Sequence, residues 1–307
     1  MMKKYILSLF MPLLFAGEVT QACSDMGFYL TQPAPYFQTG GSMKETFGIV
    51  VNGNTTQGAC NYFLTFDYGS STSYTTRSMK FGSNTWPYQV SQDAAGMQIL
   101  KKFPEGASCN DFICDKLQGN NSYNTKSHSY TISIDTTNDW RAAGTYVDTL
   151  TVRLYRGPVN NATLVTSHTQ TLTFDSHRKA DISVVSSGGS FDISKTTHTM
   201  NFASGLTTGA KGTADIILKY NAGYSLYAWT DNGGKLKKVG GTDTIDYTFK
   251  INGNVIAIPW WTLIASGSGA SPASGRVNPV EITIGNTTGK SQGSYQDTIN
   301  LTIQSNQ

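Results

Sequence analysis

The feature that most constrains the fold is a short segment that occurs twice, at residues 144–154 and 293–303. Both copies have glycine, tyrosine, aspartate and threonine at the same offsets, followed by aliphatic residues at alternate positions. In the second copy the alternating apolar residues are Tyr295, Ile299, Leu301 and Ile303. A period of two residues predicts a β-strand with one buried face. A repeat at about half the chain length predicts two tandem domains of one fold.

The two copies differ in the length of chain that comes after them. After the first copy, the chain passes a turn at Gly157 and Pro158 and enters another strand-like run at residues 162–174. After the second copy, only residues 304–307 remain. If both copies occupy the same place in their domains, we expect the first domain to have a closing strand that the second domain lacks.

The composition favours a β-protein with many turns. The chain has 307 residues, enough for two domains that each bury a core. Only 14% of the residues are charged, the net charge is +3, and no long basic run occurs, so nucleic-acid binding has no electrostatic support. No stretch shows the 3.6-residue apolar period of a helix, whereas two-residue alternation is frequent. In the second half it predicts strands at residues 181–185, 197–203, 214–220, 224–230, 244–252 and 280–284.

These patterns predict an all-β chain of two tandem immunoglobulin-like β-sandwiches, the C-terminal one lacking its final strand. The first domain is expected at residues 23–178 and the second at residues 179–307. Residues 1–22 have the pattern of a secretory signal peptide, with two lysines, a short apolar run and Ala22 before the cut. That run is too short to span a membrane. A lipoprotein signal acylated at Cys23 is the less favoured alternative, because Thr20 stands where an aliphatic residue is expected.

All four cysteines lie in the first half of the chain, at Cys23, Cys60, Cys109 and Cys114. Four cysteines allow three disulfide pairings, and the sequence alone does not choose among them. We favour Cys23–Cys60, which would tether the new N-terminus to a strand, together with Cys109–Cys114. A zinc site is disfavoured because the spacings are wrong and no histidine lies near the cysteines.

No catalytic or cofactor-binding pattern is found in the sequence. The histidines show no metal-ligand spacing and no nucleophile motif beside them, and we expect them to be exposed strand residues: His128, His168, His177 and His198. Asp148 and Asp297 occupy the same place in the two copies, which favours a structural role as acceptors of backbone N–H groups. We therefore predict that the chain is not an enzyme and has no cofactor.

Six segments carry a family resemblance: residues 76–79, 86–90 and 144–149 in the first half, and residues 221–224, 245–247 and 293–298 in the second. Through them both halves resemble spore coat protein U-type domains, the pilin fold of archaic (Csu-type) chaperone–usher pili. The resemblance covers nearly the whole mature chain, but the second half lacks the cysteine pair that is common in single-domain subunits. It implies a two-domain tip adhesin, with an N-terminal adhesin domain and a C-terminal pilin domain.

The resemblance also implies the partners and the location of the protein. A periplasmic pilus chaperone and an outer-membrane usher would handle the chain, and an adjacent pilin subunit would donate the missing strand along Tyr295, Ile299, Leu301 and Ile303. Because the mature chain would start at Cys23 with no donor segment, we expect it to end a fibre. The implied function is attachment to an abiotic or host surface and biofilm formation, at the pilus tip on the cell surface. The alternatives are a coat or shaft subunit without a binding site, and a glycan-binding lectin on the same pilus.

Apolar residues in first-domain loops are candidates for adhesive contacts, although burial is as likely for any one of them. They are Tyr36, Phe37, Phe103, Pro104, Phe112, Ile113 and Trp140. An exposed apolar patch formed by such residues would mark an interaction site. Trp260 and Trp261 belong to the second half, and we expect them in its core or at its strand-accepting edge.

Overall fold

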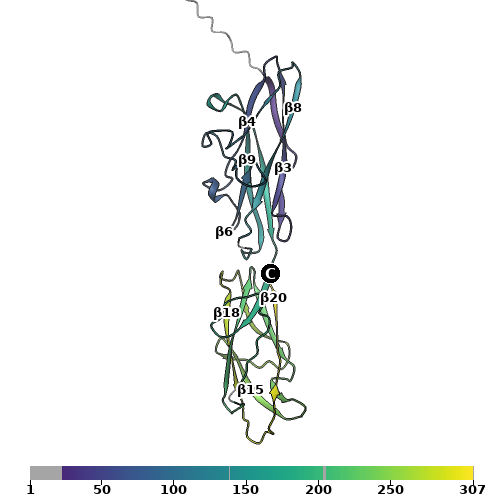
Figure 1. Cartoon of the computed structure of the whole chain (residues 1–307), viewed down its shortest axis with the longest axis vertical. Helices are drawn as coiled ribbons and strands as arrows, with labels where there is room; N and C mark the ends of the chain where they lie inside the picture. The colour runs from purple at the N-terminus through teal and green to yellow at the C-terminus, as the bar shows by residue number, and fades with distance from the viewer. Residues whose placement is uncertain (1–22, 138, 203–204, 307) are drawn as a thin grey trace, which may run out of the picture.

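The computed structural model describes residues 23–137, 139–202 and 205–306, so the expected signal peptide lies outside the described residues. The described chain is almost entirely β-structure, arranged as two β-domains end to end along one long axis (Figure 1). The short connection between them runs from Ser176 to Ala180, and the boundary expected after residue 178 falls within it.

The first domain contains ten strands and two single-turn 3-10 helices. The strands are β1 (Cys23–Leu30), β2 (Tyr36–Gln38), β3 (Lys44–Thr55), β4 (Cys60–Phe66), β5 (Ser78–Phe81), β6 (Asn84–Ser91), β7 (Ile113–Leu117), β8 (Tyr123–Ile134), β9 (Gly144–Arg156) and β10 (Thr163–Ser176). The helices are η1 (Tyr74–Thr76) and η2 (Val159–Asn161). Neighbouring strands follow the order β1-β3-β8-β6-β5-β9-β10-β2, and β4 pairs with both β7 and β9. The sheet folds into two layers that enclose one core. Strands from both ends of this order contribute to it, for example β1 with Phe28 and β2 with Phe37.

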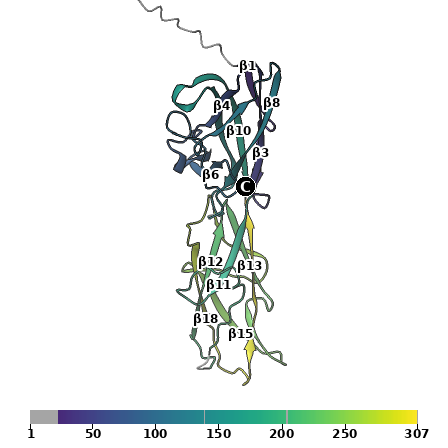
Figure 2. The same cartoon turned by 45° about the horizontal axis from the view of Figure 1, so that its top comes forward.

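The second domain contains strands β11 to β20. They are β11 (Ala180–Val185), β12 (Lys211–Tyr220), β13 (Tyr224–Thr230), β14 (Lys235–Lys238), β15 (Thr244–Ile251), β16 (Asn254–Val255), β17 (Thr262–Gly267), β18 (Arg276–Ile284), β19 (Tyr295–Gln296) and β20 (Ile299–Ser305). One set follows the order β11-β12-β18-β15-β14-β19, and the other follows β17-β13-β20. Figure 2 shows β11 beside β12, its pairing partner, below the first domain.

The two domains share one topology. The path β1-β3-β8-β6-β5-β9 corresponds to β11-β12-β18-β15-β14-β19, and β4 lies between β7 and β9 as β13 lies between β17 and β20. Strands β19 and β20 together take the place of β9. Nothing in the described part of the second domain corresponds to β10. The predicted fold class is therefore confirmed: two tandem immunoglobulin-like sandwiches, of which the second lacks its final strand.

The described part of the second domain also contains no counterpart of β2. The sequence did not predict this absence. We expected a strand at residues 197–203, but residues 197–202 form none. In the first domain β2 pairs only with β10, through Phe37 opposite Phe174. Without a strand in the β10 position, a β2-like segment has no neighbour that could satisfy its backbone groups, which explains the wrong prediction.

Equivalent hydrogen bonds support the internal duplication. The carboxylate of Asp148 accepts the backbone N–H groups of Ser70 (2.9 Å) and Thr149 (2.8 Å). The carboxylate of Asp297 accepts those of Asn232 (3.0 Å) and Thr298 (2.9 Å). The predicted structural role of both aspartates is therefore confirmed.

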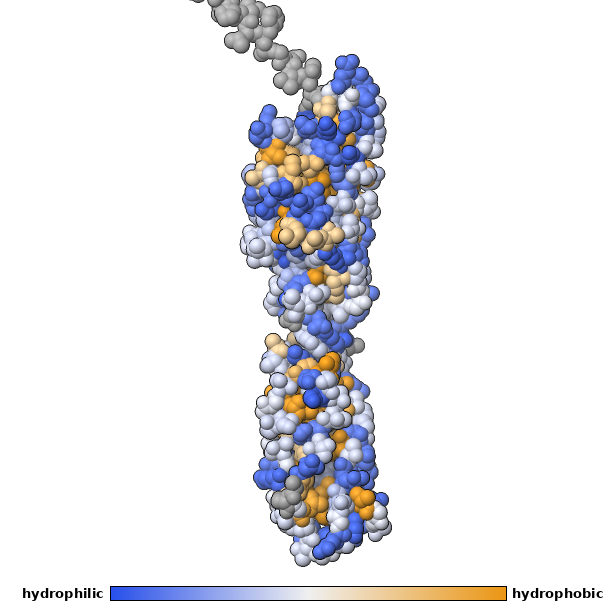
Figure 3. Space-filling model, viewed as in Figure 1, coloured by the Kyte–Doolittle hydropathy of each residue, from blue (hydrophilic) through white to orange (hydrophobic). Residues whose placement is uncertain are grey.

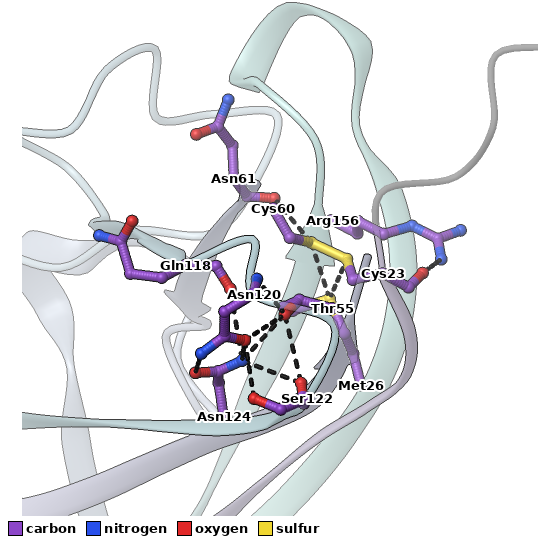
Figure 4. The surroundings of a disulfide bond; sticks show 10 residues. All are labelled: Cys23, Met26, Thr55, Cys60, Asn61, Gln118, Asn120, Ser122, Asn124 and Arg156. Atoms are coloured by element: carbon purple, nitrogen blue, oxygen red, sulfur yellow. Dashed lines mark hydrogen bonds between the residues drawn. A yellow bond between two sulfur atoms is a disulfide. The ribbon is translucent and has the colours of Figure 1, made fainter. Parts of the chain in front are cut away.

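Two disulfides lie in the first domain, and they join the pairs that we favoured. Cys23 at the start of β1 is bonded to Cys60 at the start of β4, and Cys109 is bonded to Cys114. Arg156, at the end of β9, donates to the carbonyl oxygen of Cys23 at 3.1 Å (Figure 4). The first bridge therefore fixes the beginning of β1 to the end of the domain where β9 finishes.

Candidate functional site

The repeated strand is buried in one domain and half-open in the other. In β9 the apolar side chains are 0% exposed: Tyr146, Leu150, Val152 and Leu154. Their counterparts in β19 and β20 are only partly buried: Tyr295, Ile299, Leu301 and Ile303. Because the two sequences match position by position, the difference arises from the elements that cover each strand and not from the strand itself.

Strand β10 provides the cover in the first domain. It runs antiparallel along β9 over its whole length and places Gln170 opposite Leu150 and His168 opposite Val152. Its side chains Gln170, Leu172 and Phe174 are buried, since they point into the core between the two layers. Strand β20 pairs with β13 on one side, and no strand within the described residues pairs with its other side.

The open edge leaves the second core incompletely covered. Only four partly buried hydrophobic residues border the core of the first domain, whereas fourteen border the core of the second. Among the fourteen are residues of β20, of β11, and of the irregular segment that contains Met200 and Phe202. A sheet edge with unsatisfied backbone groups and adjoining apolar side chains is suited to pair with another strand.

Three of the seven adhesive-loop candidates are buried, so the structure contradicts their assignment to an exposed contact surface. Phe37 points from β2 into the main core, and Phe112 and Ile113 are equally inaccessible. Half-buried Phe103 packs against Phe112, with 6.3 Å between the ring centroids. Pro104, beside it, is exposed.

The rings of Phe103 and Phe112 belong to an aromatic cluster outside the main core. They pack on Phe63 of β4 and Tyr155 of β9, and Phe63 and Tyr155 are stacked 5.1 Å apart. The segment before β7 therefore covers the outer face of β4 and β9. Loop position in the sequence suggested exposure, but these aromatic residues fasten the loop to the sheet.

The remaining two candidates lie near the second domain and not at the free end. Tyr36 is exposed, and its hydroxyl donates to Asp175 at 2.6 Å, next to the end of β10. Trp140 is half-buried at the junction, where it contacts Phe191 and Lys179 of the second half. The seven residues therefore do not form one apolar patch. In the view of Figure 3, hydrophobic residues reach the surface of both domains among polar ones.

An open pocket of about 390 Å³ lies beside the second disulfide. Its lining includes Asn61, Tyr62, Cys109, Cys114, Asp115 and Pro158. Strand β9 starts at the junction and ends next to this pocket, which therefore lies toward the end of the first domain remote from the second. We favoured the Cys109–Cys114 pairing and expected a turn at Gly157-Pro158, but the sequence did not show that the two segments meet.

His128 differs from the expected exposed histidine. It is half-buried beside this pocket, with its Nε2 atom 2.7 Å from the Tyr62 hydroxyl and 3.9 Å from Asp115. Burial lowers the pKa of His128, partly offset by Asp115. The described residues contain no group of histidine, cysteine and acidic side chains that could hold a metal ion. Among the same residues, no helix has the length and apolarity to cross a membrane.

Trp260 and Trp261 are not core residues, which corrects the sequence-based expectation. They are 77% and 50% exposed, and Trp261 stacks on Tyr227 and Trp229, which point away from the core. Two consecutive tryptophans in an apolar run indicated burial, because the sequence does not show which face of a sheet is left uncovered.

Comparison with protein families supports the resemblance for the first domain. Residues 41–153 match the Spore Coat Protein U domain. This segment runs from before β3 to within β9, so the similarity lies within the first domain. No curated protein sequence is significantly similar to the chain.

Several solved structures of pilus proteins are similar to the whole chain at low sequence identity. A chain of the CsuC–CsuE chaperone–tip adhesion subunit complex from Acinetobacter baumannii is 11% identical, with a TM-score of 0.41, over 89% of this chain and 99% of that chain. The CupB6 tip adhesin from Pseudomonas aeruginosa is 9% identical, with a TM-score of 0.38, over 91% and 94%. CfaE, the adhesive subunit of an enterotoxigenic Escherichia coli fimbria, is 13% identical, with a TM-score of 0.38, over 89% and 92%. At these values the similarity carries no information on function.

Proposed function

We propose that this chain is a non-enzymatic subunit of a chaperone–usher pilus that accepts a strand on β20 and places its first domain at the fibre tip as an adhesin. The observation that carries the proposal is the contrast between fully buried β9 and half-open β20. In two domains of one topology, the strand that β10 covers is buried, and the matching strand without a covering neighbour is only partly buried.

The geometry of β10 on β9 defines what the accepted strand would do. It would run antiparallel to β20 and place alternate side chains over the core beside Ile299, Leu301 and Ile303. Donor-strand complementation by an extended segment of another chain has these properties. The donor in the fibre would be an adjacent pilin subunit, and a periplasmic chaperone would cover the same edge before assembly at the outer-membrane usher.

The first domain supports the adhesive role because it needs no donor. Its core is closed by β10, and its N-terminal strand is held by the Cys23–Cys60 disulfide. A chain with one closed and one open sandwich fits a fibre end, where the closed domain is free to contact a surface. The spore coat protein U match also supports a pilus assignment. We infer transit through the periplasm, display at the cell surface, and a role in attachment and biofilm formation.

The test is complementation of the second domain in the full chain. A flexible linker and a copy of the β10 segment, residues 163–176, are fused after Gln307, because β10 already covers a strand of matching sequence. We expect the unfused chain to be unstable or aggregating, and the fused chain to be monomeric with a higher melting temperature. A matched control carries aspartate in the fused copy at the positions of Leu172 and Phe174. A stable monomeric unfused chain whose melting temperature is unchanged by the fusion would contradict strand acceptance.

Position in the fibre needs a separate measurement. Immunogold labelling of assembled fibres should place the chain once per fibre, at its end. Labels repeated along the fibre would instead favour the coat or shaft alternative.

A glycan-binding first domain is the second candidate, favoured by the pocket beside the Cys109–Cys114 disulfide. A glycan array with the chain fused to the β10 copy tests it, using exposed Lys116→Ala at the pocket wall as the variant. Saturable binding that this variant weakens, with attachment to plastic unchanged, would favour a lectin over a general surface adhesin.

A further inference from the structure

The second domain carries an exposed group of aromatic side chains that strand acceptance does not use. Trp261 stacks between Tyr227 (5.1 Å between centroids, 27° between planes) and Trp229 (4.8 Å, 25°). Trp260 and Leu263 lie beside this stack in the chain, and both are exposed. We call these five residues the aromatic face.

Tyr227, Trp229, Trp261 and Leu263 lie on the outer side of the β17-β13-β20 sheet, and exposed Trp260 comes directly before Trp261 in the chain. Along β13, Tyr224, Leu226 and Ala228 are buried in the core, so Tyr227 and Trp229 point to the opposite side. Leu263 of β17 is paired with Tyr227 and shares its side of the sheet. The aromatic face is thus outside the core and is not required to fill it.

The neighbouring strand positions on this side are polar and uncharged. Asn300 is opposite Trp229 and Thr302 is opposite Tyr227, so both β20 side chains share the outer side. Ser225, Ser266 and Gln304 extend the same side with hydroxyl and amide groups. At the end of β13, Asp231 accepts a hydrogen bond from Asn300 at 2.7 Å, which places a carboxylate at the border. A ligand for this surface should therefore be neutral and rich in hydrogen-bonding groups.

The equivalent surface of the first domain is covered by the chain itself. There, Phe103 and Phe112 pack over Phe63 and Tyr155 on the outer side of β4 and β9. In the second domain the segment before β17 places Trp261 on Tyr227 and Trp229 of β13 in the same way, but there Trp260 and Trp261 stay 77% and 50% exposed. Exposed aromatic residues in one place on an otherwise polar surface are typical of an interaction site.

A strand accepted by β20 would leave the aromatic face open. Such a strand pairs in the plane of the sheet, on the side of β20 away from β13, and its inward side chains meet Ile299, Leu301 and Ile303. Asn300 and Thr302 point to the other side. The aromatic face therefore remains accessible in the assembled state that we propose.

We propose that the aromatic face binds an uncharged polysaccharide. Indole and phenol rings pack against the C–H faces of sugar rings, and their polar edges remain able to hydrogen-bond. The amide and hydroxyl groups of Gln304, Thr302 and Ser225 match sugar hydroxyls without a charged partner. An anionic chain is disfavoured by Asp231, and a purely apolar surface would leave the polar row without partners.

Binding is tested with defined oligosaccharides and the full chain fused to the β10 copy, because the unfused chain is expected to be unstable. The neutral probes are cellohexaose, laminarihexaose, mannohexaose and chitohexaose, and hexagalacturonate is the anionic comparison. Binding of each probe is measured by calorimetry and by tryptophan fluorescence. We expect saturable binding of at least one neutral hexasaccharide and none of hexagalacturonate. Trp260→Ala should raise the dissociation constant of the neutral hexasaccharide about tenfold, which corresponds to a loss of about 1.4 kcal/mol of stacking energy. The matched control is Tyr123→Ala, which removes a 60% exposed aromatic residue from the first domain.

Three results would overturn the proposal. The first is no binding of any neutral probe at millimolar concentration. The second is binding that survives both Trp260→Ala and the double variant Trp260→Ala/Trp261→Ala in a chain with unchanged circular dichroism. The third is an effect of these variants on self-association or polystyrene adsorption alone, which would assign the face to a second copy or an apolar surface. Because the readout is oligosaccharide binding and not strand acceptance, the test can fail or succeed independently of the proposed pilus function.

Discussion

At the scale of single residues, the duplicated aspartate has a partner that the repeat did not reveal. The Tyr88 hydroxyl donates to Asp148 at 2.7 Å, and the Tyr247 hydroxyl donates to Asp297 at 2.9 Å. Burial, together with the neighbouring carboxylate, raises the pKa of both tyrosines, so each hydroxyl stays protonated as a donor. The spacing predicted that the aspartates accept hydrogen bonds, but the tyrosines come from distant strands that only the fold brings near.

Removal of the Tyr88 hydroxyl should destabilise the first domain. Tyr88→Phe leaves one bond of buried Asp148 unmade, which costs about 1–3 kcal/mol. Tyr247→Phe should cost less, because Asp297 is only partly buried and water can replace the hydroxyl. Urea unfolding of the full chain measures both, and exposed Tyr29→Phe serves as the control. If Tyr88→Phe and Tyr247→Phe lower the free energy of unfolding equally, burial of the aspartate does not determine the cost of removing the hydroxyl.

The stability of the first domain should also depend on pH through Asp175. Hydrogen bonds from Thr145 and Tyr36 lower the pKa of Asp175 below its usual value in the folded state. A lowered carboxyl pKa contributes stability that is present above the unfolded pKa and is lost as the pH falls through the folded pKa. Urea unfolding at about pH 5 and about pH 3 should therefore show that the free energy of unfolding of the wild type falls at the lower pH. The fall should be smaller in Asp175→Asn. Tyr36→Phe should reduce this fall only in part, because the hydrogen bond from Thr145 remains. If the fall in stability is unchanged in Asp175→Asn, Asp175 does not contribute to the pH dependence.

At the scale of elements, the sequence predicted strand β20 well, but it predicted poorly the segments around it, residues 197–202 and the two consecutive tryptophans. Alternation and register identified β9 and β20 as equivalent strands, and the short remainder after residue 303 predicted a missing neighbour. Residues 197–202 and the two consecutive tryptophans were assigned wrongly for one reason: both depend on the elements that lie next to them. A strand forms only beside a partner, and an apolar residue is buried only where another layer covers it.

Residues 197–202 should become a strand when the second domain accepts one. In the first domain β2 is parallel to β10 and buries Phe37. Met200 and Phe202 already lie against the second core without regular structure. Hydrogen exchange of the chain fused to the β10 copy should show new protection of amides in residues 197–202. The chain with the aspartate-substituted copy is the control, and identical exchange in the two proteins would show that the β2 position is not recreated.

At the scale of the whole molecule, the two domains are joined by buried Asn221, which belongs to a segment that carries the family resemblance but was not expected at the junction. The backbone oxygen of Asn221 accepts the N–H of Ala143 in the first domain at 2.7 Å. Its side chain accepts the N–H of Lys179 (2.7 Å) and donates to the oxygen of His177 (2.9 Å), so it holds both sides of the connection. Lys179 also lies over Trp140 and forms an ion pair with Asp139. These contacts fix the relative orientation of the domains.

The same turn also holds the end of the strand-accepting edge. The N–H of Asn306, just after β20, donates to the oxygen of Gly223 at 2.6 Å, two residues beyond Asn221. The open edge and the first domain therefore meet at one short segment. A strand that orders β20 should tighten the junction, and Asn221 is the residue through which this effect would pass.

The Asn221→Ala variant should free the domains from one another. It leaves the N–H of Lys179 and the oxygen of His177 without their buried partner, at a cost of about 1–3 kcal/mol at the junction. Small-angle scattering of the chain fused to the β10 copy should then show a broader distribution of interdomain distances, while each domain keeps its core. Exposed Asn254→Ala in the same domain is the matched control. If the distribution is unchanged in Asn221→Ala, the junction is held by Lys179, Asp139 and Trp140, and the turn at Asn221 does not couple β20 to the adhesive domain.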